Sequence, residues 1–537
     1  MKKKRLLSLG LLLVLVLSTI LAACSSDKKD DEASNTNSGG SKKEKILVFG
    51  RGSDSVSLDP SAVTDGESFK VTQNVFETLI NFGEQDTKLQ PSLATKWESS
   101  EDGLTYTFEL QEGVKFHDGT DFNAEAVVKN FERWMSGDAD KFPYFASMFG
   151  GFKGDKEAVI KEVKADGDYK VVITLNRAQA PFLKNLAMSP FGIASPTAFE
   201  KEGDKFGDNP VGTGPFKFVS WKRNDSVTIE KNKDYWKEGL PKLDKVIFRS
   251  IPDNSARLNE LNSGGIDLAD GINPSDAASI QSNSQLQIFE RPSMNVGYLG
   301  LTVTRPPFDN VKVRQAVNYA IDKQAIIDAF FEGKAEIAKN PMPPVIEGYN
   351  DDVKGYDYNP EKAKALLKEA GYDGKQIELW AMPVPRPYMP DGQKVAEAIQ
   401  KNLEDVGIKS KIVSYEWATY LDKAAKGEAD AFLLGWTGDN GDADNFLYTL
   451  LDESNIGSNN YTFFKNKETH KLLLEAQTET DEAKRNELYK KAQVILAEEA
   501  PWVPLAHSTP LLAGKADIVD FKPHPTGSDI LSKIDFK

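Results

Sequence analysis

Residues 435–446 read GWTGDNGDADNF and carry three carboxylates, those of Asp439, Asp442 and Asp444, together with two asparagines and three glycines. An apolar run at 431–434 leads into this stretch, and a second apolar run follows it. Gly, Asn and Asp supply the backbone conformations and local hydrogen bonds that a tight connection between a strand and a helix needs. A carboxylate at such a turn is well placed to hold a cationic group. The alternative is a solvated loop with an aspartate capping the helix.

The surroundings of this loop predict an α/β fold. From residue 294 onward, apolar runs typical of strands alternate with runs of helical periodicity. This alternation indicates βαβ units and a mostly parallel sheet. Binding sites in such sheets gather where strands end and helices begin. Two stretches meet that condition, residues 435–446 and the proline-rich segment 383–390.

The first half of the chain has a different pattern. Residues 104–110 alternate apolar and polar side chains, which is typical of a half-buried antiparallel strand. Asn123 is expected to cap a helix, and residues 71–80 show helical spacing. We therefore predict an antiparallel-rich part at about 83–204.

Composition restricts the function classes. A chain of 537 residues is too long for one core, so two or three domains are expected. The net charge of −15 disfavours binding to nucleic acid, which relies on Lys and Arg. The single cysteine and four scattered histidines provide no pattern for a metal site, and we find no phosphate-binding loop or nucleophile motif. No cofactor and no metal are expected.

The amino terminus is typical of an export signal. Four basic residues precede an apolar run at 6–21, and the segment ends in small residues before Cys24. Residues 21–24, LAAC, resemble the bacterial lipobox, in which the cysteine is diacylated and becomes the new amino terminus. The alternative is an ordinary signal or a membrane-spanning helix. We predict a signal peptide at 1–23 and a lipidated Cys24 that begins a flexible tether at 24–45, holding the protein on the outer face of the cell membrane, in a Gram-positive type of envelope.

Six short motifs are spread over almost the whole of the remaining chain. They are LATKW (93–97), VKFHDG (114–119), GTGPF (212–216), NVGY (295–298), VKVRQA (311–316) and GWTGDNGD (435–442). In this order and spacing they resemble the extracytoplasmic peptide-binding subunits of ABC importers, solute-binding protein family 5. LWAMPV at 379–384 and the Asp439 loop are similar to the dipeptide-binding subgroup.

The resemblance implies a periplasmic-binding-protein-like type II fold, with two α/β lobes joined by a hinge and an extra antiparallel-rich subdomain. Its expected boundaries are residues 46–82, 205–292 and 509–537 for lobe I, 83–204 for the extra subdomain and 293–508 for lobe II. The hinge would consist of two chain crossings, near residues 292 and 508.

The resemblance also implies roles for individual residues. Asp439 would pair with the α-ammonium group of a peptide, and Arg386 would pair with the terminal carboxylate of that peptide. The alternative interpretation of Arg386, from the sequence without the resemblance, is an ordinary surface arginine. A dipeptide spans roughly 7 Å, so a charge at each end would fix its length and direction. Trp436, Trp417 and Tyr388 are predicted walls, with a plain core role as the alternative. Further predicted ligand contacts are Gly438, Gly52 and Ser53.

The expected function is that of a lipid-anchored receptor, and not an enzyme, that passes short peptides, above all dipeptides, to an ABC permease and its ATPases. We expect a monomer. One alternative is a receptor of the same fold for haem, a nickel chelate, glutathione or a signalling peptide, because fold alone does not choose the ligand. The other is a surface hydrolase, which no arrangement of nucleophile and base in the sequence supports.

Overall fold

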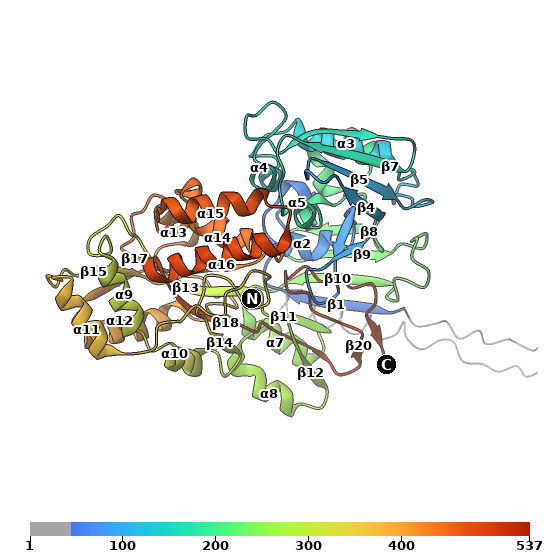
Figure 1. Cartoon of the computed structure of the whole chain (residues 1–537). Helices are drawn as coiled ribbons and strands as arrows, with labels where there is room; N and C mark the ends of the chain where they lie inside the picture. The colour runs from blue at the N-terminus through green and yellow to red at the C-terminus, as the bar shows by residue number, and fades with distance from the viewer. Residues whose placement is uncertain (1–43) are drawn as a thin grey trace, which may run out of the picture. The chain divides into compact units, whose positions relative to one another are not determined.

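The computed structural model describes residues 44–537, which form one compact unit (Figure 1). Cys24, the predicted signal peptide and the tether up to residue 43 lie outside the described residues. Along 44–537, none of the helices combines the length and apolarity that crossing a bilayer requires. Three larger sheets organise this part of the chain.

A seven-stranded sheet has the order β12-β19-β11-β1-β10-β9-β8. At its centre, β1 pairs in parallel with β10 and β11, and the outer pairs are antiparallel. The helices α2 (Gly66–Thr72), α7 (Asn254–Ser263) and α8 (Ala277–Ser282) belong to the same region. The strands are β1 (Ile46–Arg51), β8 (Phe216–Lys222), β9 (Ser226–Lys231), β10 (Lys245–Ser250), β11 (Leu268–Ile272), β12 (Leu286–Glu290) and β19 (Leu511–Lys515).

A four-stranded antiparallel sheet occupies the predicted antiparallel region. Its order is β4-β5-β7-β6, from β4 (Ala94–Ser99), β5 (Thr105–Leu110), β6 (Ile160–Ala165) and β7 (Lys170–Leu175). The predicted strand is confirmed as β5, and Asn123 caps α3 (Ala124–Met135) by accepting a hydrogen bond from the Ala126 amide. The inner face of the sheet and α3 share a core rich in aromatic side chains, which includes Phe108 and Trp134. Two short helices, α4 (Pro143–Phe149) and α5 (Phe182–Leu186), complete this part.

A six-stranded sheet has the order β14-β18-β13-β17-β15-β16. Its strands are β13 (Asn295–Leu301), β14 (Ala335–Ile337), β15 (Ile377–Trp380), β16 (Ser410–Val413), β17 (Ala431–Thr437) and β18 (Trp502–Ser508). The helices around it are α9 (Val311–Ala320), α10 (Lys323–Phe330), α11 (Pro360–Glu369), α12 (Gly392–Asp405), α13 (Trp417–Ala425), α14 (Asp444–Leu451), α15 (Lys467–Thr478) and α16 (Glu482–Glu499). Figure 1 shows α15 and α16 side by side.

The prediction of a mostly parallel sheet is wrong for this region. Only the β15–β16 and β15–β17 pairs are parallel, whereas β13 is antiparallel to both of its neighbours, β17 and β18. β18 comes from the far end of the chain, after α16, and inserts beside β13. Alternation of elements along the sequence cannot give the direction of a strand that returns from such a distance.

The predicted helix at 71–80 is also wrong. The helix is α2, which ends at Thr72, and the chain then turns and enters β2 (Ile80–Phe82). Asn74 explains the early end, because its side-chain amide donates to the carbonyl oxygens of Lys70 and Asp529, and its side-chain oxygen accepts from the Leu531 amide. An asparagine that bonds to the backbone in this way competes with helical hydrogen bonding.

The chain passes between the seven-stranded and six-stranded sheets twice. It leaves β12 and enters β13 across residues 291–294, and it leaves β18 and enters β19 across residues 509–510. At the first crossing, Arg291 donates to both carboxylate oxygens of Asp529, at 2.7 and 2.9 Å. The domain boundaries and the hinge stay predictions. The two crossings at 291–294 and 509–510 are the segments at which the predicted hinge would lie.

Candidate functional site

The Asp439 loop, residues 438–443, connects β17 to α14, as the sequence pattern predicts for a strand-to-helix turn. The Gly438 amide donates to the Met294 carbonyl oxygen at 2.8 Å, which fixes the start of the loop. Gly441 has φ +64, and an added Cβ would lie 1.9 Å from Thr87 Oγ1, so this position requires glycine. The loop therefore has little freedom.

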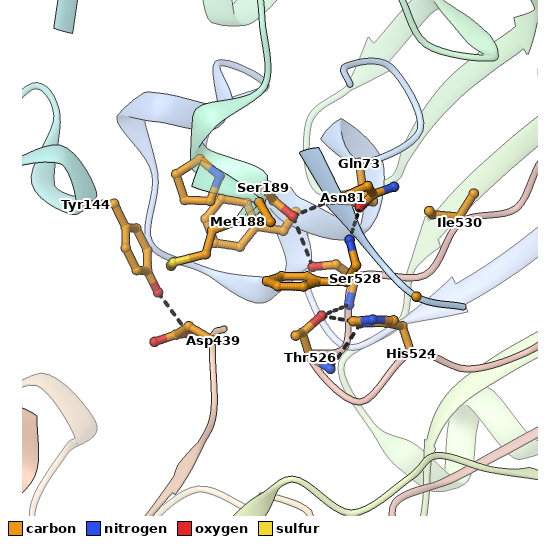
Figure 2. A pocket seen from close by; sticks show the side chains of 15 residues that line it. Gln73, Asn81, Tyr144, Met188, Ser189, Asp439, His524, Thr526, Ser528 and Ile530 are labelled. Atoms are coloured by element: carbon orange, nitrogen blue, oxygen red, sulfur yellow. Dashed lines mark hydrogen bonds between the residues drawn. The ribbon is translucent and has the colours of Figure 1, made fainter. Parts of the chain in front are cut away.

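Asp439 lies at the centre of a small hydrogen-bond cluster. Its Oδ2 accepts from Asn445 Nδ2 at 3.1 Å, and its amide donates to Asn445 Oδ1 at 3.0 Å. Trp436 Nε1 donates to the same Asn445 oxygen at 3.0 Å. The other carboxylate oxygen of Asp439 accepts from the Tyr144 hydroxyl at 3.1 Å (Figure 2). Asn445 and Trp436 therefore orient Asp439, and Tyr144 reaches it from α4.

The hydrogen-bond donors around Asp439 are neutral. Burial raises the pKa of its carboxyl group to about 6, and the bonds from Asn445 and Tyr144 oppose this shift. At neutral pH the carboxylate is still ionised, and these neutral partners do not compensate its charge. A half-buried anion in this condition is suited to a small cation such as an ammonium group.

The other two carboxylates of the stretch have different partners. Asp442 receives two hydrogen bonds from Arg485 of α16, at 2.6 and 2.8 Å, and this pairing outweighs burial and lowers its pKa to about 2. Burial and the neighbouring Asp442 raise the pKa of Asp444 to about 7, and its Oδ1 is buried without a hydrogen-bond partner. Of the three aspartates, Asp439 is the one that lines the cavity described next.

The Asp439 cavity has a volume of about 50 Å³. Most of its wall comes from residues that the sequence analysis did not select, because they are distant in the chain and belong to no motif. They include Gln73, Asn81, Tyr144, Met188, Ser189, His524, Thr526 and Ser528 (Figure 2). Burial lowers the pKa of His524, so its ring is neutral. Its Nδ1 forms a hydrogen bond with Thr526 Oγ1, and its Nε2 forms one with the Asp86 carbonyl oxygen. The scattered histidines gave no hint of this position.

Arg386 does not line this cavity. Its side chain is exposed, its Nη1 donates to the Pro385 carbonyl oxygen at 3.1 Å, and its guanidinium lies 5.8 Å from the centre of the Trp417 ring. Its backbone exchanges two hydrogen bonds with Met389, which makes a tight turn of the proline-rich segment. The structure thus holds the backbone of Arg386 firmly while the side chain projects into solvent.

The remaining predicted residues lie in several places. Tyr388 is buried against β13 and β17, so close that a Cβ on Gly435 would lie 2.2 Å from its ring. Trp417 is half-buried and stacks on Tyr420 with ring centres 5.8 Å apart. Gly52 follows β1 beside Glu67 and Arg257, and the neighbouring Ser53 is exposed. Of the eight predicted ligand contacts, only Asp439 lines the cavity, with Trp436 and Gly438 supporting its loop.

The described residues contain no cluster of three or more His, Cys, Asp or Glu side chains suited to a metal ion. The neutral donors and single carboxylate at the Asp439 cavity favour reversible binding of a polar organic group.

Comparison with known proteins identifies the family. Residues 88–458 match bacterial extracellular solute-binding proteins, family 5. The dipeptide-binding protein of Escherichia coli is 40% identical over 499 residues, covering 90% of this chain and 93% of that protein. Heme-binding protein A of Haemophilus influenzae is 39% identical over 488 residues, covering 88% of this chain and 89% of that protein.

A solved structure has the same fold. The ABC transporter-associated periplasmic binding protein DppA from Helicobacter pylori, in complex with the peptide STSA, is 35% identical and superimposes with a TM-score of 0.80, covering 91% of this chain and 98% of that one. The predicted resemblance and the mixed α/β solute-binding fold are confirmed, and so is the prediction of a binding protein and not an enzyme. The chain belongs to family 5 of the bacterial extracellular solute-binding proteins.

Proposed function

We propose that this protein is a receptor for short peptides, above all dipeptides, that holds the peptide's α-ammonium group at Asp439 and delivers the peptide to an ABC importer. The observation that carries the proposal is the ionised Asp439 carboxylate, which lines a cavity and has only neutral hydrogen-bond partners. The names of the Escherichia coli relative and the peptide bound to the Helicobacter pylori relative support a peptide ligand.

Arg386 is the proposed partner of the dipeptide's terminal carboxylate. Its exposed guanidinium would have to approach the ligand when the lobes close, and the rigid turn at 385–389 limits that movement to the side chain. We also propose that Cys24 carries the lipid anchor and that the monomeric receptor meets its permease at the outer face of the membrane. Mass spectrometry of the protein from membranes tests the anchor through diacylation of Cys24.

The test of the function is calorimetric titration of dialanine into the protein and its Asp439→Asn variant. The amide keeps the size of the side chain and removes its charge, so we expect the affinity to fall at least about 30-fold, which corresponds to about 2 kcal/mol for a lost buried charge pair. The exposed Asp351→Asn variant is the matched control and should bind normally. Normal dialanine binding by Asp439→Asn would overturn the assignment.

Glutathione is a second candidate, because its γ-glutamyl residue carries the same α-ammonium group that the Asp439 cavity would recognise. Competition between dialanine and either glutathione or hemin distinguishes the ligand classes. Tight hemin binding without heat from dialanine would favour the function named for the Haemophilus influenzae relative.

A further inference from the structure

The C-terminal segment 524–529 forms one wall of the Asp439 cavity, and we call it the cavity loop. His524, Thr526 and Ser528 line the cavity. Figure 2 shows these side chains on one side of the cavity, with Asp439 across from them. The position of the cavity loop therefore contributes to the shape of the site, and the proposed roles of Asp439 and Arg386 do not explain what holds it.

Hydrogen bonds within the cavity loop bring its two ends together. The Gly527 amide donates to the His524 carbonyl oxygen at 2.9 Å, and the His524 amide donates to Asp529 Oδ1 at 2.8 Å. Gly527 has φ +83, a backbone conformation that favours glycine. A single group placed beside this turn can therefore hold both ends of the loop.

Arg291 is placed there. Its Nη1 donates to the His524 carbonyl oxygen and, at 2.7 Å, to Asp529 Oδ1, while its Nη2 donates to Asp529 Oδ2 at 2.9 Å. The side chains of Arg291 and Asp529 are both buried. A guanidinium that binds both oxygens of a carboxylate fixes the orientation of the pair as well as its charge. One planar group thus binds the first and the last residue of the cavity loop.

The surrounding charges identify Asp529 as the main partner of Arg291. Asp270 Oδ1 lies 3.9 Å from Arg291 Nη2, but the Asp270 carboxylate makes a shorter contact, of 2.5 Å, with Lys70. Lys70 also pairs with Glu67 at 2.8 Å. Because Lys70 is shared by two carboxylates, Arg291 is the principal counter-ion of Asp529.

Arg291 also belongs to the first of the two chain crossings. Its backbone amide donates to the Pro510 carbonyl oxygen at 2.9 Å, which ties the first crossing to the second. Beyond the crossings, the Asn295 side chain accepts from the Ser508 amide at 3.0 Å and donates to the Ser508 carbonyl oxygen at 2.9 Å. The two crossings are therefore joined to each other, and the residue that holds the cavity loop is part of this joint.

We propose that Arg291 is a positioning residue, which fixes the cavity loop to the joint so that this wall of the ligand site and the two crossings move together. The inference rests on the proposed function, in which the lobes close over a peptide. A ligand that contacts the cavity loop then restrains the crossings through Arg291. Linkage makes the effect reciprocal, so closing of the joint raises the affinity by the same factor by which the ligand favours closing.

The variant that tests the proposal is Arg291→Lys. Lysine keeps a positive charge beside Asp529 but lacks the planar fork that reaches both ends of the loop. In the ligand-free protein, site-resolved hydrogen exchange at the His524 and Gly527 amides should become at least about tenfold faster, because their hydrogen bonds belong to the loop. Calorimetry should show that the dialanine affinity falls at least about fivefold. A melting scan verifies that the variant folds.

Arg133→Lys is the matched control. Arg133 lies in α3, its side chain is 14% exposed, and it pairs with Asp59 at 2.5 Å. This variant also weakens a pair between a buried arginine and an aspartate, but one that belongs to neither the cavity loop nor the crossings. Its melting temperature should fall, while the dialanine affinity and the exchange at His524 and Gly527 should stay within about twofold of the unmodified protein.

A second readout separates coupling from a merely structural role. It is the exchange of the backbone amide of residue 291, which bonds to the Pro510 carbonyl oxygen. Saturating dialanine should slow this exchange at least about fivefold in the unmodified protein and in Arg133→Lys. In Arg291→Lys, saturating dialanine should change it less than about twofold, because the link between loop and crossing is lost.

The outcomes distinguish this inference from the proposed function. Unchanged exchange at His524 and Gly527 in Arg291→Lys would overturn the positioning role. Faster exchange there, with an unchanged dialanine affinity or an unchanged response at residue 291, would overturn the coupling while the receptor function stands. If the unmodified protein does not bind dialanine, the proposed function and the coupling both fail, and exchange in the ligand-free variant still decides whether Arg291 holds the loop.

Discussion

We expect Asp439 to couple peptide binding to pH. Its pKa of about 6 means that the carboxylate is mostly ionised at pH 7 and mostly protonated at pH 5. The peptide's α-amine remains an ammonium over this interval, because its ordinary pKa is about 7.7–8.0. Binding needs the ionised carboxylate, so affinity should be high above the pKa and fall as the pH drops through it. We expect about a tenfold loss of dialanine affinity between pH 7 and pH 5, measured by calorimetry.

The control for this prediction is Asp439→Asn, whose residual weak binding should not change with pH over the same interval. Asp442 cannot produce the same dependence, because Arg485 holds its pKa at about 2. An affinity that is constant from pH 7 to pH 5 in the unmodified protein would contradict a role for Asp439 as the ammonium partner.

The sequence indicated the loop that carries the Asp439 cavity residue, but it could not separate the three aspartates of that loop. Local composition showed Asp439, Asp442 and Asp444 as equivalent acids in one turn. Their roles are decided by distant partners: Tyr144 reaches Asp439 from 295 residues away, and Arg485 reaches Asp442 from 43 residues away. The assignment of Asp439 came from family resemblance, and no periodicity would have supplied it.

At the scale of elements, the ion pair between α16 and the Asp439 loop is the main tie that local pattern could not predict. Arg485 is largely buried and donates to Asp442 and to the Tyr489 hydroxyl. Arg485→Ala leaves the Asp442 carboxylate buried and unpaired, so the free energy of unfolding should fall by about 3–5 kcal/mol. Urea denaturation measures this change.

Lys484→Ala is the matched control for that variant. Lys484 is the adjacent residue, its side chain is 71% exposed, and its pairing with Asp481 at 3.7 Å is a surface contact. Such pairs contribute about 0–1 kcal/mol. Equal losses for the two variants would show that the pairing of Arg485 with Asp442 does not stabilise the loop.

Element prediction succeeded where the signal was local. The Asn123 cap is a short-range feature that the structure confirms. Pro360 at the start of α11 and Gly371, at φ +67 after its end, are equally local signals. Element prediction failed where contacts with distant parts of the chain determine where an element ends or which strand it pairs with. Asn74 ends α2 through contacts with the C-terminal segment, and β18 enters its sheet from the end of the chain. The stretch 472–499 has a continuous helical pattern in the sequence, but it is divided between α15 and α16, which pack against each other.

At the scale of the whole molecule, polar contacts join the antiparallel part to the Asp439 loop. Lys184 Nζ donates to the Gly441 carbonyl oxygen at 3.0 Å, Asn440 Nδ2 donates to Asn185 Oδ1 at 2.8 Å, and Tyr144 holds Asp439 itself. The only covalent links between the two larger sheets are the crossings at 291–294 and 509–510 within the described chain. We propose that these few hydrogen bonds oppose a hinge movement about the two crossings.

We expect these contacts to favour the closed form of the ligand-free protein over a more open form. Each hydrogen bond contributes about 0.5–1.5 kcal/mol, so Lys184→Ala with Asn185→Ala should favour a more open ligand-free molecule. Small-angle scattering should then give a larger radius of gyration without ligand, and saturating dialanine should restore the compact value, because the peptide adds its own contacts between the lobes. The exposed Lys201→Ala variant serves as control. A ligand-free double variant with an unchanged scattering curve would mean that the crossings, and not the contacts at the Asp439 loop, hold the molecule closed.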